Sequence, residues 1–295
     1  MRLLAAFLVA VVLASVASAA LPVRSFVRSA GPVEARRTIV LVNGGPGYDS
    51  QQIFRAFKRL SSPTRRVIAY DQRGIGRTPA PSSVPADYSL DAFVADLEAL
   101  RLRLGVQRID VLGHSFGALV ASAYTAAHPT RVRSLILHSG LPMSVTAQYE
   151  GDARFEKRLG LLQRRGVVPG SVPALCTERT RGLLPVYLGD ARRAATIAAA
   201  LGPFRCDDSV AVVANEAIVS DPRRHALELA LARYRGPALV LMGARDPFGA
   251  HWADDNAAPL RGARLTKKVL PNAGHFLWLE SPLLFPEVRA FLATS

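Results

Sequence analysis

A serine lies between two glycines in the segment Gly113-His114-Ser115-Phe116-Gly117. The apolar segment 108–113 predicts a strand, and the small-residue segment 115–129 predicts a helix that ends at a proline. A tight turn from strand to helix exposes a serine hydroxyl, and the flanking glycines remove side chains that would collide with neighbouring elements. We therefore predict that Ser115 is a nucleophile rather than an ordinary turn serine.

A serine hydroxyl needs a base that takes its proton and an acid that fixes the tautomer of that base. In strand–turn–helix sites the chain order is serine, acid, histidine. Of the six histidines, His275 alone follows the last predicted strand, in a loop after a glycine, so we predict that it is the base. Asp246 ends the strand-like segment 236–246, at the sheet edge where such sites assemble, and is the predicted acid. Asp254 and Asp255 are the alternatives.

Acyl transfer also needs hydrogen-bond donors for the developing oxyanion. The segment 42–47, Val-Asn-Gly-Gly-Pro-Gly, ends an apolar strand in a glycine-rich turn. We predict that the N–H groups of Gly45 and Phe116 form the oxyanion hole. A phosphate-binding loop is the rival interpretation, but no Gly-Lys-Ser or Gly-Lys-Thr follows.

Alternating strand and helix patterns must position these residues. Apolar segments at 37–45, 65–74, 108–113, 132–140 and 236–246 each predict a strand, and the segment 263–275 contains the last strand, before the loop with His275. Helical patterns occupy 89–105, 115–129 and the end of the chain from about Ser281. Strands that are apolar on both faces indicate a mostly parallel sheet with helices on both faces, an α/β fold.

The alternation of strand and helix segments stops between residues 141 and 235, where the sequence is helical and rich in loops. We predict an α/β core formed by residues 21–140 and 236–295, with residues 141–235 as an inserted helical cap that selects the substrate.

The first twenty residues predict a secretory signal peptide. A basic start precedes a short apolar segment and Ala17-Ser18-Ala19, which indicates cleavage near Ala19 or Ala20. An uncleaved anchor is the alternative. We expect a secreted or periplasmic protein with no stable membrane insertion once the signal is cleaved.

Charge and cysteine content narrow the function classes. Lys and Arg total 37 against 23 Asp and Glu, a net charge of +14, but the arginines are scattered. They indicate a solvated surface, and we expect no nucleic-acid partner. The two cysteines, Cys176 and Cys206, form either a disulfide or two buried thiols. Without a Cys-x-x-Cys pattern we expect no metal, and the predicted chemistry needs no cofactor.

These motifs together resemble a known family. The segments Asn-Gly-Gly-Pro-Gly, Asp-Gln-Arg-Gly-Ile-Gly-Arg-Thr, Gly-His-Ser-Phe-Gly, Gly-Ala-Arg-Asp-Pro and Ala-Gly-His-Phe occur in the order typical of α/β-hydrolases. The first two resemble the proline iminopeptidase and tripeptidyl aminopeptidase branch, with Asn43 in place of the usual histidine and Thr78 in place of serine. In the second motif, we expect Asp71 and Arg73 to form an ion-paired turn that supports the glycine loop.

The resemblance implies a peptidase that releases N-terminal proline or a short N-terminal peptide through an acyl-enzyme. It also implies acidic cap residues that bind the free ammonium of the substrate. Glu216 is our first candidate, because it interrupts an apolar helical segment, and Glu178 is the second; an exposed helix glutamate is the alternative for Glu216. Two other functions remain: a carboxylic-ester or lactone hydrolase of the same fold, and a non-catalytic binding protein on a hydrolase scaffold.

Overall fold

The computed structural model describes residues 21–82, 84–219 and 221–295, so the predicted signal peptide lies outside the described residues. Within them, seven strands form one sheet in the order β1-β3-β2-β4-β5-β6-β7. The strands are β1 (Val27–Ala30), β2 (Arg37–Val42), β3 (Arg65–Tyr70), β4 (Ile109–His114), β5 (Val132–His138), β6 (Pro237–Gly243) and β7 (Arg264–Leu270). β1 pairs antiparallel with β3, and all other pairings are parallel.

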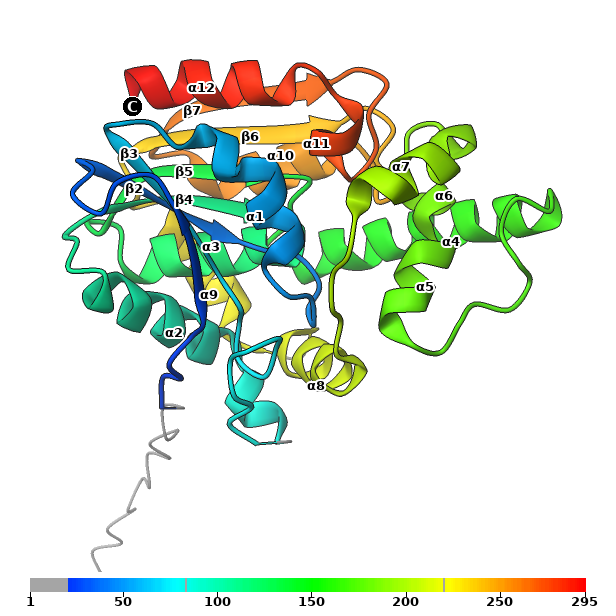
Figure 1. Ribbon diagram of the computed structural model, residues 1–295, viewed down its shortest axis with the longest axis horizontal. Coiled ribbons are helices and arrows are strands. Elements are labelled where there is room, and N and C mark those ends of the chain that lie inside the picture. The colour runs from blue at the N-terminus through cyan, green and yellow to red at the C-terminus, as the bar shows by residue number, and fades with distance from the viewer. Residues whose placement is uncertain (1–20, 83, 220) are drawn as a thin grey trace, which may run out of the picture.

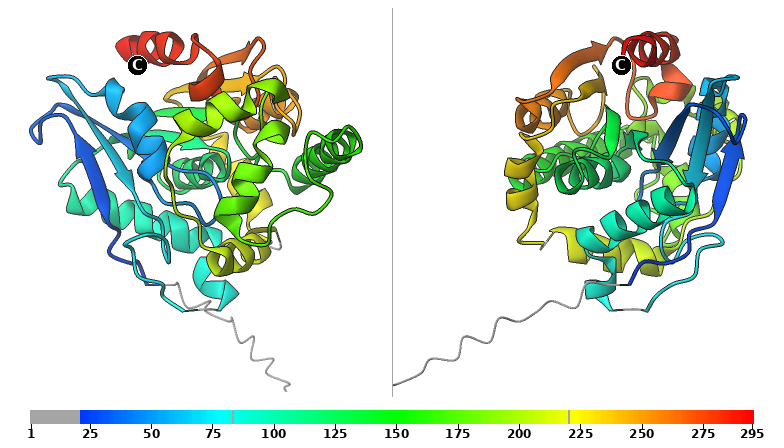
Figure 2. Two further views of the ribbon diagram at one scale, coloured as in Figure 1. Left: turned by 45° about the vertical axis from the view of Figure 1, so that its right-hand side comes forward. Right: turned by 90° about the vertical axis from the view of Figure 1, so that its left-hand side faces the viewer.

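Helices cover both faces of this sheet. The helices of the chain's core are α1 (Gln51–Phe57), α2 (Leu90–Arg103), α3 (Phe116–Ala127), α9 (Arg224–Leu231), α10 (Trp252–Ala257), α11 (Leu277–Glu280) and α12 (Leu284–Thr294). Short 3-10 turns are η1 (Lys58–Leu60), η2 (Pro85–Tyr88) and η4 (Ala258–Leu260). Figures 1 and 2 show α12 and α2 on opposite sides of the sheet.

Successive side chains of the central strands point to opposite faces of the sheet, where they pack into two hydrophobic cores. In β2, Ile39 and Leu41 pack with α1 and α12, whereas Val40 and Val42 pack with α2 and α3. Every residue of β4 and of β6 is buried, as expected for strands covered on both faces. The predicted mostly parallel sheet with helices on both faces is confirmed. The edge strand β7 differs, because it exposes polar side chains such as Lys267 and Lys268 to solvent.

The segment between β5 and β6 contains six α-helices among the described residues. Before α9, these are α4 (Val145–Arg164), α5 (Cys176–Gly182), α6 (Leu184–Tyr187), α7 (Ala194–Leu201) and α8 (Asp208–Val219), with the turn η3 (Ala191–Arg193). Helices α4 to α7 lie beyond the carboxyl ends of the strands (Figure 1). By contrast, α9 packs on α3, with Leu231 in the core. The last helix of the segment expected to be a cap therefore belongs to the layer that covers the sheet.

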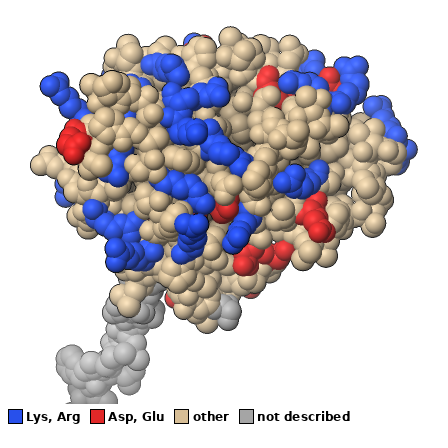
Figure 3. All heavy atoms as spheres, in the orientation of Figure 1, with Lys and Arg blue, Asp and Glu red and all other residues tan. Residues whose placement is uncertain are grey.

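The surface carries the excess of basic residues noted in the sequence. On the face shown in Figure 3, Lys and Arg side chains are spread widely and outnumber the acidic ones. Some arginines are paired inside the fold: Arg37 bonds Asp110, and Arg73 bonds Asp96 in a fully buried pair.

Candidate active site

Ser115 occupies the turn from strand β4 into helix α3. Its φ of 53° and ψ of −124° lie in a region that side-chain-bearing residues rarely adopt. Strain of this kind needs support on both sides of the turn, here a fully buried strand and a fully buried first helical turn. The turn directs the Ser115 hydroxyl away from the sheet, toward the loops at the carboxyl ends of the strands.

The glycines beside Ser115 are required by close packing. A Cβ on Gly117 would overlap the carbonyl oxygen of Val42 in the adjacent strand β2. A Cβ on Gly113 would overlap the carbonyl oxygen of Gly117. Glycine at both positions therefore lets α3 begin directly against the sheet and holds the serine at its edge.

His275 lies between Ser115 and Asp246. The Ser115 hydroxyl donates to Nε2 of His275 over 3.0 Å, and Nδ1–H of His275 donates to Oδ2 of Asp246 over 2.9 Å. The side chain of His275 is 3% exposed and that of Asp246 is 0% exposed. Asp246 also accepts the N–H of Phe248, which fixes its orientation. The three residues that the sequence proposed as a nucleophile, base and acid thus form one hydrogen-bonded chain.

The alternative acids lie away from this chain. Asp254 pairs with Lys267 at the surface, and Asp255 lies 3.8 Å from the imidazole of His251.

Two other histidines are buried beneath His275. The ring centroid of His114 lies 5.0 Å from that of His275, and the ring of His138 stacks on His114 at 4.7 Å. Burial lowers the pKa of His114 well below its ordinary value and lowers the pKa of His138 to about 3. Both rings are therefore neutral near pH 7 and pack as aromatic groups, with Trp278 edge-on to each.

Two elements that could supply backbone N–H groups lie beside the serine. Phe116 is the first residue of α3, where helical N–H groups have no partner within the helix. On the other side, a Cβ on Gly44 would lie only 3.0 Å from Cβ of Ser115, so the glycine loop approaches the nucleophile at Gly44. A Cβ on Gly45 would instead meet the loop's own N atom of Gly47. The Gly45 N–H as an oxyanion donor remains a prediction.

The Asp-Gln-Arg-Gly motif supports this glycine loop from below. Gln72 donates to the carbonyl of Asn43 over 3.0 Å. Asp71 accepts the N–H and the hydroxyl of Ser50, which begins α1. The expected ion pair between Asp71 and Arg73 is wrong, because Asp71 pairs with Arg28 and Arg73 pairs with Asp96. The motif therefore anchors the loop through Asp71 and Gln72.

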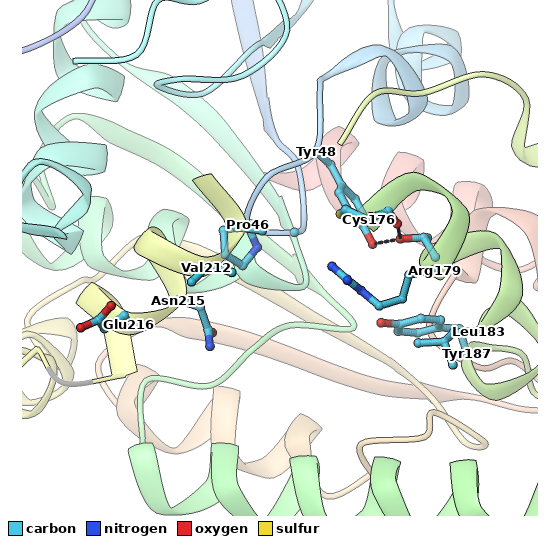
Figure 4. A pocket seen from close by; sticks show the side chains of 12 residues that line it. Pro46, Tyr48, Cys176, Arg179, Leu183, Tyr187, Val212, Asn215 and Glu216 are labelled. Atoms are coloured by element: carbon cyan, nitrogen blue, oxygen red, sulfur yellow. Dashed lines mark hydrogen bonds between the residues drawn. The ribbon is translucent and has the colours of Figure 1, made fainter. Parts of the chain in front are cut away.

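A pocket of about 430 Å³ opens beside the glycine loop. Its wall includes Pro46 and Tyr48 of that loop, Arg179 of α5, Tyr187 of α6 and Asn215 of α8 (Figure 4). Tyr187 connects the pocket to the triad, because its backbone carbonyl accepts the backbone N–H of His275 over 2.8 Å. The pocket therefore adjoins the loop that carries His275, although Ser115, His275 and Asp246 are not among its lining residues.

Arg179 supplies the positive charge in this pocket. Figure 4 shows its guanidinium directed between Tyr48 and Tyr187. Asp208 accepts one of its N–H groups over 2.8 Å and accepts the Cys176 N–H as well. The Cys176 N–H, and then Arg179, lower the pKa of Asp208. The pair holds Arg179 in place at the start of α5.

A disulfide joins Cys176 to Cys206, which settles the question that the sequence left open. It attaches α5 to the segment 205–207, and that segment pairs with the loop after the glycine turn. The Asp49 N–H donates to the carbonyl of Arg205, and the Asp207 N–H donates to that of Gly47, both over 2.9 Å. The disulfide therefore ties the wall of the pocket to the loop beside the nucleophile.

The two predicted ammonium-binding glutamates lie on exposed surfaces. Glu178 is exposed and does not line the pocket, so the structure does not bring it to the site. Glu216 lies at the rim of the pocket, but its carboxylate is exposed and points away from Arg179 and Tyr187 (Figure 4). An amphipathic helix accounts for this, because α8 buries Val210, Ala214 and Ile218 instead.

Sequence reasoning missed Arg179 and Tyr187. The only sequence signal for Arg179 is its position three residues after Cys176. Tyr187 lies in a cap segment without a recognisable motif.

Two further searches concern the described residues alone. In residues 21–82, 84–219 and 221–295, no group of three or more His, Cys, Asp or Glu side chains is arranged to hold a metal ion. Over the same residues, no helix has the length and apolar character needed to cross a bilayer.

Comparison with known proteins identifies the fold. The family model described as alpha/beta hydrolase fold matches residues 37–181. A proline iminopeptidase of Lactobacillus crispatus (strain ST1) is 36% identical over 119 residues, which are 40% of this chain and 40% of that relative. A proline iminopeptidase of Xylella fastidiosa (strain 9a5c) is 35% identical over 102 residues, 34% of this chain and 31% of that relative. The chain therefore matches well under half the length of these relatives.

Solved structures match over more of the chain. A proline iminopeptidase-related protein of Thermus thermophilus has a TM-score of 0.65 at 27% identity, over 92% of this chain and 94% of that one. A carboxylesterase structure from Nitrososphaera gargenis has a TM-score of 0.66 at 20% identity, over 92% of this chain and 95% of that one. The second match bears on the fold alone.

Proposed function

The chain has the α/β-hydrolase fold and a distant, partial relationship to proline iminopeptidases, and on that premise we propose that it is a serine hydrolase with Ser115 as its nucleophile. The observation that carries the proposal is the chain of hydrogen bonds from Ser115 through His275 to Asp246. A strained serine at a strand-to-helix turn, bonded to an imidazole that a buried carboxylate orients, is the arrangement that acyl transfer requires.

The proposed reaction has two halves. Oγ of Ser115 attacks the substrate carbonyl carbon while Nε2 of His275 takes the hydroxyl proton. Asp246 stabilises the imidazolium, and the oxyanion accepts the Phe116 N–H and an N–H of the glycine loop. Loss of one such donor typically costs about 3 kcal/mol of transition-state stabilisation. His275 then protonates the leaving group, and the acyl-enzyme forms. Water, deprotonated by His275, releases the acid and restores Ser115.

Within this class we propose an aminopeptidase that releases N-terminal proline or a short N-terminal peptide. The support is the similarity to proline iminopeptidases, at 36% identity over 119 residues. Glu216 at the pocket rim is the carboxylate available to a substrate ammonium, in an exposed position. We therefore expect its contribution to binding to be modest.

A second candidate is an ester hydrolase, and one observation favours it. The pocket directs the Arg179 guanidinium inward, whereas the Glu216 carboxylate points away (Figure 4). The guanidinium pairs with Asp208 and also donates to the carbonyl of Ala174. Its remaining N–H groups suit an acyl group that ends in a carboxylate or another polar acceptor.

A substrate panel separates the two candidates. Prolyl- and tripeptidyl-naphthylamides are compared with their N-blocked forms, and p-nitrophenyl hemisuccinate with the uncharged p-nitrophenyl butyrate. An aminopeptidase turns over only the free-amine peptides, and Glu216→Gln raises their KM. Equal turnover of free and blocked peptides contradicts the aminopeptidase proposal. A preference for the hemisuccinate that Arg179→Gln abolishes supports the ester hydrolase.

We further propose that the protein is exported. The support is the signal-like sequence of residues 1–20 together with the disulfide, since disulfides persist in oxidising compartments. Amino-terminal sequencing of the protein from fractionated cells tests this. A mature chain that begins near Leu21, found outside the cytoplasm, is the expected result, and an intact cytoplasmic chain would contradict it.

A further inference from the structure

The end of the sheet opposite Ser115 carries an unusual set of arginines. Parallel strands begin at one edge of a sheet and end at the other, and Ser115 follows the carboxyl end of β4. At the opposite edge, an arginine stands just before or just after the start of each of the last four strands. These residues are Arg108 before β4, Arg133 in β5, Arg235 before β6 and Arg264 at the start of β7.

Strand register brings these arginines together. Ile109 pairs with Val132, and Pro237 pairs with Arg264, so the four strands start side by side. A pocket of about 570 Å³ lies at this edge, lined by all four arginines and by Arg233 in the turn after α9. We name these five residues the arginine pocket. The pocket lies about 20 Å from the triad, the length of a six-residue strand.

The positive charge of the arginine pocket is not neutralised within the described residues. None of its five side chains is among the ion pairs that other arginines form with Asp or Glu. The nearby carboxylate of Asp110 is bonded to Arg37 and Ser134. Ser295 also lines the pocket, and its backbone oxygen and hydroxyl accept hydrogen bonds from Arg37.

Four of these arginines, Arg108, Arg233, Arg235 and Arg264, are exposed, and Arg133 is half-buried, so most of their N–H groups face solvent. An arginine has five N–H groups, and Arg108, Arg235 and Arg264 each donate one to a backbone carbonyl. Nε of Arg133 is buried and has no partner among the described residues. A buried donor without a partner costs free energy.

The place of the arginine pocket explains why the charges are tolerated without a ligand. Helices α3 and α9 end at this edge, after Ala127 and Leu231. The carbonyl groups at helix C-termini carry partial negative charge, and cations there are stabilising. This does not balance five full charges in one pocket, so an anion of several charges is the complementary ligand.

From this geometry we propose that the arginine pocket binds a compact polyanion that carries two or more phosphate groups. Planar guanidinium groups match phosphate oxygens through paired hydrogen bonds, better than lysine does. The pocket volume lies in the range of small-ligand sites and exceeds what one phosphate ion fills. The ligand is either a free polyphosphate compound or the headgroup of a phospholipid. This inference does not depend on the reaction at Ser115.

Isothermal titration of the full chain with inorganic tripolyphosphate tests the proposal. We expect saturable binding of one ligand per chain. In Arg133→Gln/Arg235→Gln we expect binding to weaken at least tenfold. The matched control is Arg192→Gln/Arg193→Gln, which removes the same charge from two exposed residues of η3 and should leave the affinity within twofold. Arg233→Gln changes an exposed side chain outside any strand, so it tests the pocket even if the double variant fails to fold.

A second arm identifies the source of the phosphate groups. Co-sedimentation with phosphatidylcholine vesicles that contain cardiolipin, which carries two phosphates, is compared with pure phosphatidylcholine vesicles. Cardiolipin binding that the pocket variants abolish indicates a lipid headgroup, and tripolyphosphate binding alone indicates a free ligand. The proposal is overturned if neither probe binds saturably, or if the control pair weakens binding as much as the pocket pair does.

Discussion

The hydroxyl of Ser115 lies 3.0 Å from Nε2 of His275, although 160 residues separate the two in sequence. The parallel sheet brings them together, because β4 and β7 deliver their following loops to the same edge. Asp246, in the loop after β6, completes the chain of hydrogen bonds at that edge.

Removal of the charge on Asp246 should impair the reaction without unfolding the chain. In Asp246→Asn the amide no longer selects the imidazole tautomer that accepts the serine proton. By analogy with serine-protease triads, we expect kcat to fall about 10⁴-fold. Hydrolysis of p-nitrophenyl acetate measures this. Asp254→Asn is the control, since that side chain is 70% exposed and pairs with Lys267 at the surface. A fall of less than tenfold in Asp246→Asn would remove the residue from the triad.

A methyl group on Gly117 should destabilise the nucleophile turn. The new Cβ would overlap the Val42 carbonyl oxygen, which is held rigidly in the sheet. Overpacking of this kind costs roughly 1–3 kcal/mol, so we expect Gly117→Ala to lower the free energy of unfolding by that amount and to reduce kcat as Ser115 shifts. Gly170→Ala is the control, because its Cβ would meet nothing within 4 Å. Urea denaturation of both variants measures the difference, and equal midpoints would contradict this packing.

Loss of the disulfide should affect substrate binding more than chemistry. The disulfide closes a sequence separation of 30 residues, for which chain entropy predicts roughly 3–4 kcal/mol of stabilisation. It holds α5 and Arg179 against the glycine loop but does not touch the triad. We expect Cys176→Ala/Cys206→Ala to unfold at lower urea concentration and to raise KM several-fold with kcat within about threefold. A change in kcat alone would contradict this division of roles.

The buried histidines should make the fold sensitive to acid. The pKa of His138 is about 3 in the folded chain against an ordinary value of 6.5, chiefly because of burial. Between these values the unfolded chain binds a proton that the folded chain does not, so stability falls as pH decreases, by about 1.4 kcal/mol per pH unit for one such group. Neither ring nitrogen of His138 has a partner among the described residues.

His138→Leu removes this titration at no cost in hydrogen bonds. We expect the free energy of unfolding to decrease less between pH 6.5 and pH 5 in this variant than in the unaltered chain. His225→Leu is the control, since the His225 side chain is 78% exposed and should leave the slope unchanged. An unchanged slope in His138→Leu would mean that the ring is not held neutral by burial.

The sequence was most informative where backbone geometry restricts the choice of residue. The alternation of apolar strand segments with helical segments predicted the sheet, and the glycines at 113 and 117 predicted the turn that carries Ser115. The roles of Asp246 and His275 were predicted from the chain order serine, acid, histidine. Asp246 ends a strand-like segment, and His275 follows the last strand. The short edge strand β1 was missed, because only four half-exposed residues form it.

The pocket was less predictable because it depends on contacts between distant segments. The expectation that Glu178 and Glu216 face the substrate rested on a resemblance that covers no motif in the cap. Helix α8 turns its apolar residues inward and leaves Glu216 at the rim. Asp208 and the disulfide hold Arg179 in place; the sequence offered the disulfide as one of two alternatives, but the pairing of Arg179 with Asp208 has no signature in the sequence.

Covalent labelling of Ser115 tests the central claim most directly. The full chain is treated with a fluorophosphonate at neutral pH, and the labelled peptide is identified by mass spectrometry. We expect one adduct, on Ser115, that is absent in Ser115→Ala and forms much more slowly in His275→Ala. No adduct on the folded protein, or an adduct at another serine that persists in Ser115→Ala, would contradict it.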